Sequence, residues 1–380
     1  MNLLRRLPLS RLLALCAGLV VLGASLAAIA PAAGSGPVPR AKSLAAAVHD
    51  ALAAPTVEGV SANVTLTDHL VEGADLATGG SGGEAGQFSS SALLSGASGR
   101  MWVAKDGRIR LELQAEKGDT QIIYDGHTVQ LYDASTNTLY RYTPSAEGGE
   151  AGKPEPEGHH EVPSEAKIEE AIAHLRKHAN VSGATPTDVA GQPAYTVRIS
   201  PNERGSLFGG VELSWDAVHG VPLRAAVYST TSSAPVIELA ATEISYGPIP
   251  SSVFEFTYPP GVKVHEIAAS SAAAKGTSPA GAADKRQAAR ADSTNHPKVR
   301  TTGHGASSIA IVEQTSPSAK SGSGVQGLPE GLPKVKINGA TATELATPLG
   351  TVLSFERAGV RYLLLGSVTP SALEAAARGL

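Results

Sequence analysis

The chain has 380 residues, a formal net charge of -4, 17% charged residues and no block of basic residues. This composition provides no electrostatic footprint for nucleic acid, so we expect no nucleic-acid partner. Cys16 is the one cysteine, which excludes a disulfide framework or a cysteine metal site from the rest of the chain. Aromatic residues make up only 4%, so any core or cavity must be mainly aliphatic.

The N-terminus has the layout of an export signal. Arg5, Arg6 and Arg11 precede an uncharged apolar run of 19 residues, 12–30, and small residues follow it. The run is long enough to span a bilayer, and the arginines favour an N-terminus inside with the remainder outside. We expect residues 1–33 to be either a cleaved signal peptide or a retained membrane anchor, and the rest to be extracytoplasmic, in the cell envelope. Lipid modification of Cys16 is disfavoured because Leu15 is too large for that processing step.

After a Pro/Gly/Ala tether over 31–42, Ser43 is predicted to cap a short helix that ends at Pro55. The apolar period then changes to two, and turns such as Asp106-Gly107 and Asp125-Gly126 punctuate a β-meander. Its predicted strands cover 60–66, 101–103, 109–113, 122–124, 129–131 and 139–142. A Gly/Ser-rich stretch over 73–99 interrupts the meander and is predicted to be a loop.

A second half follows the loop predicted over 144–163. A helix is predicted over 164–179, and a second meander over 189–191, 195–199, 211–215, 223–227 and 237–241, closed by Phe254, Phe256 and Tyr258. Residues 266–298 are predicted to be a disordered linker. A small unit over 299–380 is predicted to have strands over 309–312, 335–337, 352–355 and 362–365 and a closing helix over 370–378.

Motifs that carry chemistry are weak. The glycine-rich run 79–83 matches Gly-x-Ser-x-Gly, but no strand precedes it and no helix follows, so the match is ascribed to biased composition. His174 and His178 have a metal-capable spacing, but they lie on the predicted solvated back of an amphipathic helix. Trp215 and Asp216 are interpreted as a strand end and the start of a turn. We therefore expect no catalytic residue, no metal site and no cofactor.

The strands before Val262 are apolar on one face only, which is typical of an antiparallel sheet with one dry face. Two amphipathic helices accompany them, so the predicted fold class is α+β. Helices across a curved sheet make either a filled core or a lidded cavity, and the periodicity leaves both open.

Three segments resemble a known family. Residues 123–142, IYDGHTVQLYDASTNTLYRY, look like the central hairpin of the Lol-type lipoprotein-carrier family. Residues 249–264, IPSSVFEFTYPPGVKV, resemble its closing motif, and residues 215–224, WDAVHGVPLR, resemble the strand pair between them. The fold is also similar to the sensor domain of periplasmic regulators of envelope-stress sigma factors. The three matches occur in the family's order and cover roughly residues 43–265.

The resemblance implies a half-open β-barrel closed by lid helices, with an aliphatic cavity for the acyl chains of lipids or lipoproteins and without catalysis. The expected lining consists of Ile109, Leu111, Leu113, Ile122, Tyr124, Val129, Leu131, Ile168, Ile172, Leu175, Val197, Ile199, Leu213, Leu223, Val227 and Leu239. The chain departs from the family in its 73–99 insertion, its N-terminal run and its added C-terminal unit. That unit, especially residues 347–367, looks like the small β-rich domain beside carrier-type domains in envelope and anti-sigma-factor proteins.

Two functions remain open at this stage. In the first, the chain is a carrier that holds acyl chains in the apolar sheet domain. In the second, it is a membrane-tethered sensor or adaptor whose C-terminal domain grips a membrane-protein partner. The linker and the N-terminal run favour the sensor, whereas the single-faced apolar sheet favours the carrier.

Overall fold

The computed structural model describes residues 36–70, 96–116, 118–143, 162–267, 298–315, 328 and 331–380. The predicted signal or anchor, nearly all of the Gly/Ser-rich insertion with run 79–83, and almost all of the loop 144–163 and of the linker 266–298 lie outside these residues. The chain divides into a large unit, which contains most of the residues up to 268, and a small unit, which contains 203–207 and the residues from 269 onward.

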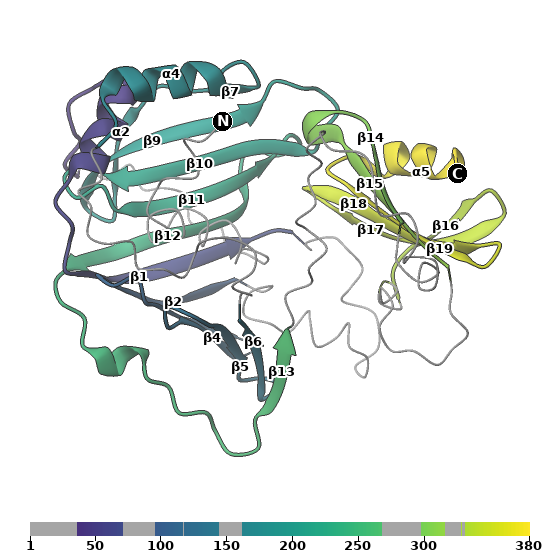
Figure 1. Ribbon diagram of the computed structural model, residues 1–380, viewed down its shortest axis with the longest axis horizontal. Coiled ribbons are helices and arrows are strands. Elements are labelled where there is room, and N and C mark those ends of the chain that lie inside the picture. The colour runs from purple at the N-terminus through teal and green to yellow at the C-terminus, as the bar shows by residue number, and fades with distance from the viewer. Residues whose placement is uncertain are drawn as a thin grey trace, which may run out of the picture. The chain divides into compact units, whose positions relative to one another are not determined.

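The large unit is built on one curved sheet of 13 strands (Figure 1). In chain order these are β1 (Gly59–Asp68), β2 (Ala97–Ala104), β3 (Ile109–Ala115), β4 (Gly118–Tyr124), β5 (Val129–Asp133), β6 (Thr138–Tyr142), β7 (Ala179–Val181), β8 (Thr185–Val189), β9 (Gln192–Pro201), β10 (Phe208–Asp216), β11 (Pro222–Ser229), β12 (Pro235–Tyr246) and β13 (Lys263–Ile267).

Neighbouring strands follow the order β13-β6-β5-β4-β3-β2-β1-β12-β11-β10-β9-β7, and β8 pairs with β9. Strands β13 and β7 end this order without pairing to each other, so the sheet is open rather than a closed barrel. β1 therefore pairs with β12, the last strand of the second meander, which joins the two predicted meanders into one sheet. The predicted fold class, a curved sheet with helices and a small β-rich domain, is confirmed.

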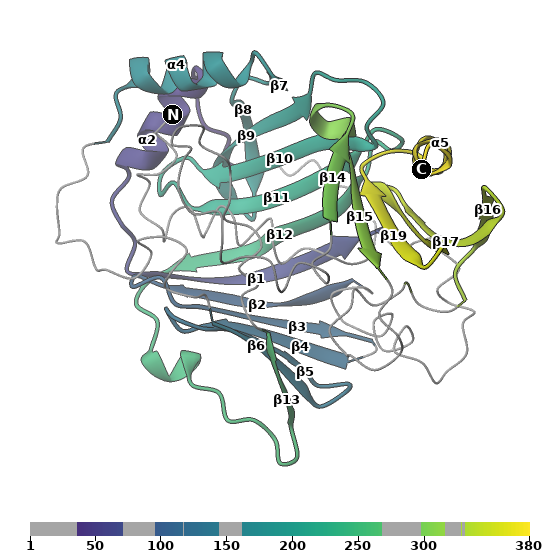
Figure 2. The ribbon, with the colours of Figure 1, turned by 45° about the vertical axis from the view of Figure 1, so that its right-hand side comes forward.

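Two helices, α2 (Leu44–Ala53) and α4 (Glu165–Leu175), lie together against β9 and β10 (Figure 2). Each begins at a serine whose hydroxyl accepts an N–H bond, Ser43 from Ala46 and Ser164 from Lys167, as serine caps usually do. The apolar stripes of both helices pack with Tyr195 of β9 in one buried cluster. The helices thus cover one end of the sheet.

A strap formed by residues 247–262 covers part of the opposite face. It contains the short helix η3 (Ser251–Phe254), and the Arg110 side chain on β3 donates to the Val253 carbonyl at 2.7 Å. Phe256 and Tyr258 pack against Tyr132, with ring centroids 5.7 and 6.0 Å apart. The sheet therefore has an apolar contact on both faces here, whereas the alternation predicted only one dry face.

The strap leads into β13, which pairs with β6 in parallel. The sequence predicted an antiparallel sheet throughout. The strap instead returns the chain to the β6 edge in the same direction as β6, so this pair of strands is parallel. The sequence indicated neither β13 nor β7. Helix α4 ends at Leu175 rather than at residue 179, because the last N–H groups turn back within a tightened turn, His178 to the Leu175 carbonyl at 3.0 Å.

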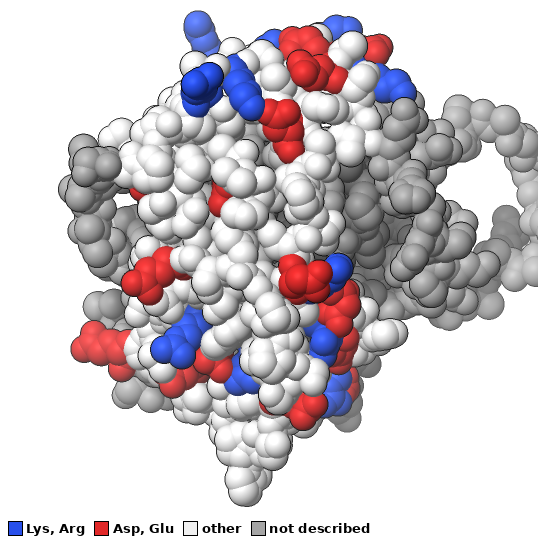
Figure 3. Space-filling view, turned by 90° about the vertical axis from the view of Figure 1, so that its left-hand side faces the viewer, with Lys and Arg blue, Asp and Glu red and all other residues white. Residues whose placement is uncertain are grey.

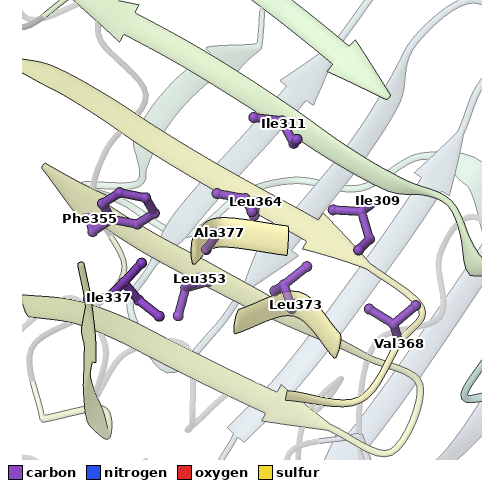
Figure 4. Packing of buried hydrophobic residues seen from close by; sticks show 10 residues of the cluster. Ile309, Ile311, Ile337, Leu353, Phe355, Leu364, Val368, Leu373 and Ala377 are labelled. Carbon is purple, nitrogen blue, oxygen red and sulfur yellow. The ribbon is translucent and has the colours of Figure 1, made fainter. Parts of the chain in front are cut away.

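The small unit contains a sheet of six strands with the order β14-β15-β19-β18-β17-β16. Its elements are β14 (Lys298–Thr302), η5 (Gly305–Ser307), β15 (Ile309–Thr315), β16 (Lys334–Ile337), β17 (Ala340–Thr347), β18 (Gly350–Arg357), β19 (Val360–Gly366) and α5 (Pro370–Arg378). Leu373 and Ala377 of α5 pack on Leu353 and Leu364 (Figure 4), and Ile337 completes the fully buried centre.

Strands β14 and β17 were not predicted from the sequence. In β17 the positions that face α5 are Ala342, Glu344 and Ala346, because they pair with Phe355, Leu353 and Thr351 of β18. Two alanines and a glutamate give no aliphatic alternation, so the usual signal for a half-buried strand is missing.

Candidate functional site

The inner face of the large sheet, defined as the face on which α2 and α4 pack, is mainly apolar, but Thr120, Asp133 and Thr138 form a polar row across β4, β5 and β6. Strand register places its residues. Ile109 pairs with Tyr124, which pairs with Val129, and these three positions therefore share one face. Across the other half, Leu239 pairs with Ala225 and Ala225 with Leu213. Residues paired directly across β1 and β12, such as Leu66 with Leu239, join the two halves.

All the predicted lining positions that lie on strands fall on this inner face. They are Ile109, Leu111, Leu113, Ile122, Tyr124, Val129, Leu131, Val197, Ile199, Leu213, Leu223, Val227 and Leu239. The alternation that identified them therefore reports a common face, because residues separated by two positions on a strand point to the same side.

The inner face contains two packed clusters. One includes Leu111, Leu113, Ile122, Val129, Leu131 and Leu239, together with apolar residues of β1 and β2. The other includes Val197, Ile199 and Leu213 with Ile168 and Ile172 of α4 and the apolar stripe of α2. Ile109, Tyr124, Leu223 and Val227 share the face but belong to neither cluster. The helices thus pack into the second cluster only.

Leu175 is not brought to the inner face. Its side chain is 39% exposed, and it is absent from the cluster that contains Ile168 and Ile172. It is the last residue of α4, where the helix tightens into a turn. The buried stripe of α4 therefore ends at Ile172. Leu175 was predicted to lie in the lining, and the structure instead places it at an exposed position.

The inner face becomes exposed toward the β13 edge of the sheet. Tyr140 and Tyr142 of β6 are each 37% exposed, and Ile267 of β13 is 50% exposed. Tyr140 pairs with Leu131 on β5, and Tyr142 pairs with Val129. The alternation of β6 already placed both tyrosines on the lining face, but the sequence analysis did not single them out.

Asp68 is a buried carboxyl at the end of β1 on the inner face. It follows Leu66 by two positions, and its side chain is fully buried. One carboxylate oxygen accepts the Leu70 N–H, whereas the other, Oδ2, has no hydrogen-bond partner among the residues that the structure describes. Burial raises the pKa of Asp68 to about 7, against the lowering effect of the Leu70 N–H. Period-two spacing after Leu66 could have indicated it, since an acidic residue in that position must enter an apolar face.

The motif at residues 215–220 forms a structural turn. Asp216 is fully buried, and its carboxylate accepts N–H bonds from Val218 at 2.6 Å and His219 at 2.9 Å. Tyr246 of β12 donates its hydroxyl to the same carboxylate at 2.5 Å. Burial works against ionisation of Asp216, but these hydrogen bonds hold the pKa of the carboxyl below its usual range. The interpretation of Trp215-Asp216 as a strand end and turn is confirmed.

The outer face of β9–β12 carries a charged network rather than an apolar layer. Arg224 on β11 bonds to Glu212 on β10 and to Glu238 on β12, and it also donates to the Tyr228 hydroxyl at 3.0 Å. The Arg198 guanidinium lies 4.0 Å from the Tyr228 ring centre. In the view of Figure 3, basic and acidic groups lie side by side in the upper and lower parts of the surface, with a broad uncharged area between them.

The described residues contain no group of three or more His, Cys, Asp or Glu side chains that could hold a metal ion. His174 and His178 have ring centroids 5.9 Å apart, but His178 lies beyond the end of α4, so the two are not one turn apart on a continuous helix as predicted. Among the described residues no helix is long and apolar enough to cross a membrane.

Solved structures with a similar arrangement were found at low identity. MucB from Pseudomonas aeruginosa in complex with MucA has 12% identity and a TM-score of 0.42, covering 88% of this chain and 96% of that chain. MucB alone gives 12% identity and a TM-score of 0.37, covering 88% and 95%. A LolA superfamily protein from Nitrosomonas europaea gives 11% identity and a TM-score of 0.22, covering 57% and 99%.

No family model and no curated protein matches the chain. The solved structures include the Lol-type family to which the sequence was predicted to be similar. Likenesses of this degree assign no role to any residue of this chain.

Proposed function

We propose that this protein binds acyl chains of lipids or lipoproteins on the inner face of its large sheet, outside the cytoplasmic membrane and without catalysis. The observation that carries the proposal is the continuity of the apolar inner face. One row runs Ala62, Met101, Leu111, Ile122 and Leu131 across five consecutive strands. The parallel row Val60, Val103, Ile109, Tyr124 and Val129 is also free of charged groups. Two such adjacent rows suit a flexible hydrocarbon chain, which needs no directional partner.

The helices support a binding face more than a filled core. α2 and α4 pack into the cluster at β9 and β10, whereas the cluster over β1–β5 contains no residue of either helix. From the second half of the sheet, Ala190 of the β8–β9 turn and residues of β12 pack against that cluster. We therefore place the acyl chain over β1–β5, next to the helices.

The energetics of acyl burial are sufficient. Each methylene removed from water contributes about 0.8 kcal/mol, so about ten methylenes give about 8 kcal/mol, which corresponds to a dissociation constant of about 1 μM. The entropic cost of association makes the net binding free energy smaller than this, and burial of a second acyl chain would offset that cost. Burial of an acyl chain in this way requires no hydrogen bond or cofactor.

Fluorescent fatty-acid displacement tests the proposal. The variant Leu131→Lys puts a charge on the inner face at a partly buried position, whereas Gln130→Lys puts the same charge on the opposite face of the same strand. We expect Leu131→Lys to weaken binding by about tenfold or more, the order expected for a charge placed against an alkyl chain. Gln130→Lys should leave it unchanged, with circular dichroism confirming that both variants fold. Equal loss in both variants would contradict the proposal.

A sensor or adaptor role is the second candidate, and one feature of the small sheet favours it. The face opposite α5 carries Val299, Val312, Leu345, Val352, Leu363 and Leu365, which are in register with one another. Val299 is 64% and Leu365 42% exposed. Strands β15 and β19 therefore supply both a core face and an exposed apolar face, and the latter suits a partner protein.

A truncation near residue 270 separates the two roles. A carrier should bind fatty acid with the small unit removed, as strongly as the full-length chain does. A sensor should keep fatty-acid binding but lose a membrane-protein partner, and in the full-length chain Leu365→Asp should lose that partner as well. Glu356→Ser, an exposed change on the same face, is the control. If the full-length chain captures no membrane partner, the sensor role fails.

A further inference from the structure

The inner face has an exposed end at the β6–β13 edge, and the residues there form one surface. Tyr140 pairs with His265, and Tyr142 pairs with Ile267, so all four side chains lie on the inner face. We define these four residues as the edge patch. On β5, Tyr140 pairs with Leu131 and Tyr142 pairs with Val129, and both β5 residues belong to the proposed lining. The patch therefore continues the binding face to the edge of the sheet.

The exposure is greater at the β13 end of this face than at β1. In one row, Val60 of β1 is 4% exposed, Val103, Ile109, Tyr124 and Val129 are half-buried, and Tyr142 and Ile267 are 37% and 50% exposed. Four large apolar side chains that are exposed in the described part of the large unit lie on β6 and β13. They are Tyr140, Tyr142, Ile267 and Val264. The fourth, Val264, points to the opposite face, because it pairs with Leu139.

The chemistry of the patch suits the interface of a bilayer better than the surface of a folded protein. Tyrosine has an apolar ring and a polar tip, and it is enriched where hydrocarbon meets head groups. The rings of Tyr140 and His265 stack with centroids 5.5 Å apart, so the polar imidazole nitrogens lie beside the apolar tyrosine ring. Lys263, on the inner face of the same strand, makes no ion pair with a described residue and faces the same side. A cation without an ion pair among the described residues, on the strand that carries His265 and Ile267, is complementary to anionic lipid head groups.

We propose that the edge patch docks on the surface of an anionic lipid bilayer, where acyl chains pass between the membrane and the inner face. The proposal rests on the acyl-binding function and names its partner surface. Docking there requires no opening of the helices, because β13 is the unpaired end of the sheet. Lys263 contributes attraction to the head groups, and Tyr140, Tyr142 and Ile267 insert at the boundary.

Hydrogen exchange of the full-length chain with vesicles tests the docking. The exchange of backbone amides in 138–142 and 263–267 should slow on adding phosphatidylglycerol vesicles, by about tenfold, and less with phosphatidylcholine vesicles. Because the readout is local to these strands, an apolar N-terminal run held in the same vesicles does not produce it. Protection confined to other segments would overturn the proposal.

Variants make the test specific. Tyr142→Ser with Ile267→Ser should abolish the protection, and Lys263→Glu should reduce it about fivefold with anionic vesicles only. Val264→Ser, on the other face of the same strand, is the matched control and should keep the protection. Equal loss in the control overturns the docking, and so does a concentration-dependent dimer that the double variant disrupts, since a second copy would then occupy the patch.

Fatty-acid binding in vesicle-free solution separates this inference from the proposed function. Lys263→Glu, which lies outside the proposed acyl site over β1–β5, should bind a fluorescent fatty acid as the unmodified chain does, while its transfer from anionic vesicles slows. If the unmodified chain binds vesicles through the edge patch but binds no fatty acid, the acyl-binding function fails and the docking stands. If it binds fatty acid but shows no vesicle protection at the patch, the docking alone fails.

Discussion

The hydroxyl of Tyr246, at the end of β12, donates to the fully buried carboxylate of Asp216 at 2.5 Å, and so fastens the β10–β11 turn to the strand that joins the two halves of the sheet. His219 supports the same carboxylate through its ring nitrogen at 3.1 Å, and its ring lies 4.0 Å from that of Tyr246. A buried carboxylate is costly unless its donors are present, so each of these bonds matters for stability.

Replacement of this tyrosine tests that relationship. Tyr246→Phe should lower the free energy of unfolding by about 1 to 3 kcal/mol at pH 7, because a buried carboxylate loses a donor. The lowered pKa of Asp216 stabilises the fold above the carboxyl's unfolded value, so the difference should shrink as the pH falls through the folded pKa. Denaturant unfolding at pH 7 and pH 3 measures both. Tyr124→Phe, which removes an exposed bond to the Gly126 carbonyl at 2.9 Å, should cost under about 0.5 kcal/mol and is the control.

Gly220 is required where the same turn meets α2. Its φ is +67°, and a Cβ there would lie 2.2 Å from the Ala51 carbonyl oxygen. Gly220→Ala should therefore destabilise the protein by more than about 2 kcal/mol, the sum of left-handed strain and a clash with the helix backbone. Gly191→Ala shares the positive φ, +72°, but meets nothing within 4 Å, so it should cost about 1 kcal/mol. Thermal unfolding of both variants gives the difference, and equal losses would mean that α2 does not pack on the turn.

The buried Asp68 predicts a pH-dependent stability. Its folded pKa of about 7 is raised above the unfolded value, so its contribution is fully favourable below about pH 4 and is lost as the pH rises to about 7. Asp68→Asn keeps an acceptor for the Leu70 N–H and removes the charge. We expect the variant to be more stable than the unmodified chain by on the order of 2 kcal/mol at pH 8, and about equal at pH 4. A constant difference across that range, measured by thermal unfolding, would contradict this account.

The placement of α4 is tested by a pair of truncations. Ile172 is 9% exposed within the helix cluster, so Ile172→Ala should cost about 2 to 4 kcal/mol. Leu175→Ala, at 39% exposure, should cost under about 0.5 kcal/mol. Urea unfolding of both variants measures the ratio, and a large loss at Leu175 would restore it to the inner face.

Alternation predicted the face of each strand well, because register follows from period-two burial once the strands pair. The lining strands and the helix caps at Ser43 and Ser164 follow from local sequence alone. Period-two alternation could not predict that β13 pairs with β6 in parallel, because that pairing depends on where the strap carries the chain. It also misses β17, whose buried positions are Ala342 and Glu344.

The chemistry of the inner face was harder to predict than its shape. Asp68 enters an apolar row with one carboxylate oxygen unbonded among the described residues, and its raised pKa depends on burial that only tertiary packing creates. The edge patch is equally dependent on neighbours, because the exposure of Tyr140 and Tyr142 reflects the end of the sheet and no feature of β6 itself.

The central claim, acyl binding on the inner face, is tested most directly by native mass spectrometry of the full-length protein purified from membranes, together with fluorescent fatty-acid displacement. The account predicts a co-purifying lipid mass that the unmodified chain retains and that Leu131→Lys loses, and displacement with a dissociation constant of about 1 μM. A protein that co-purifies with no lipid, and from which an added fatty acid displaces no probe, would contradict it.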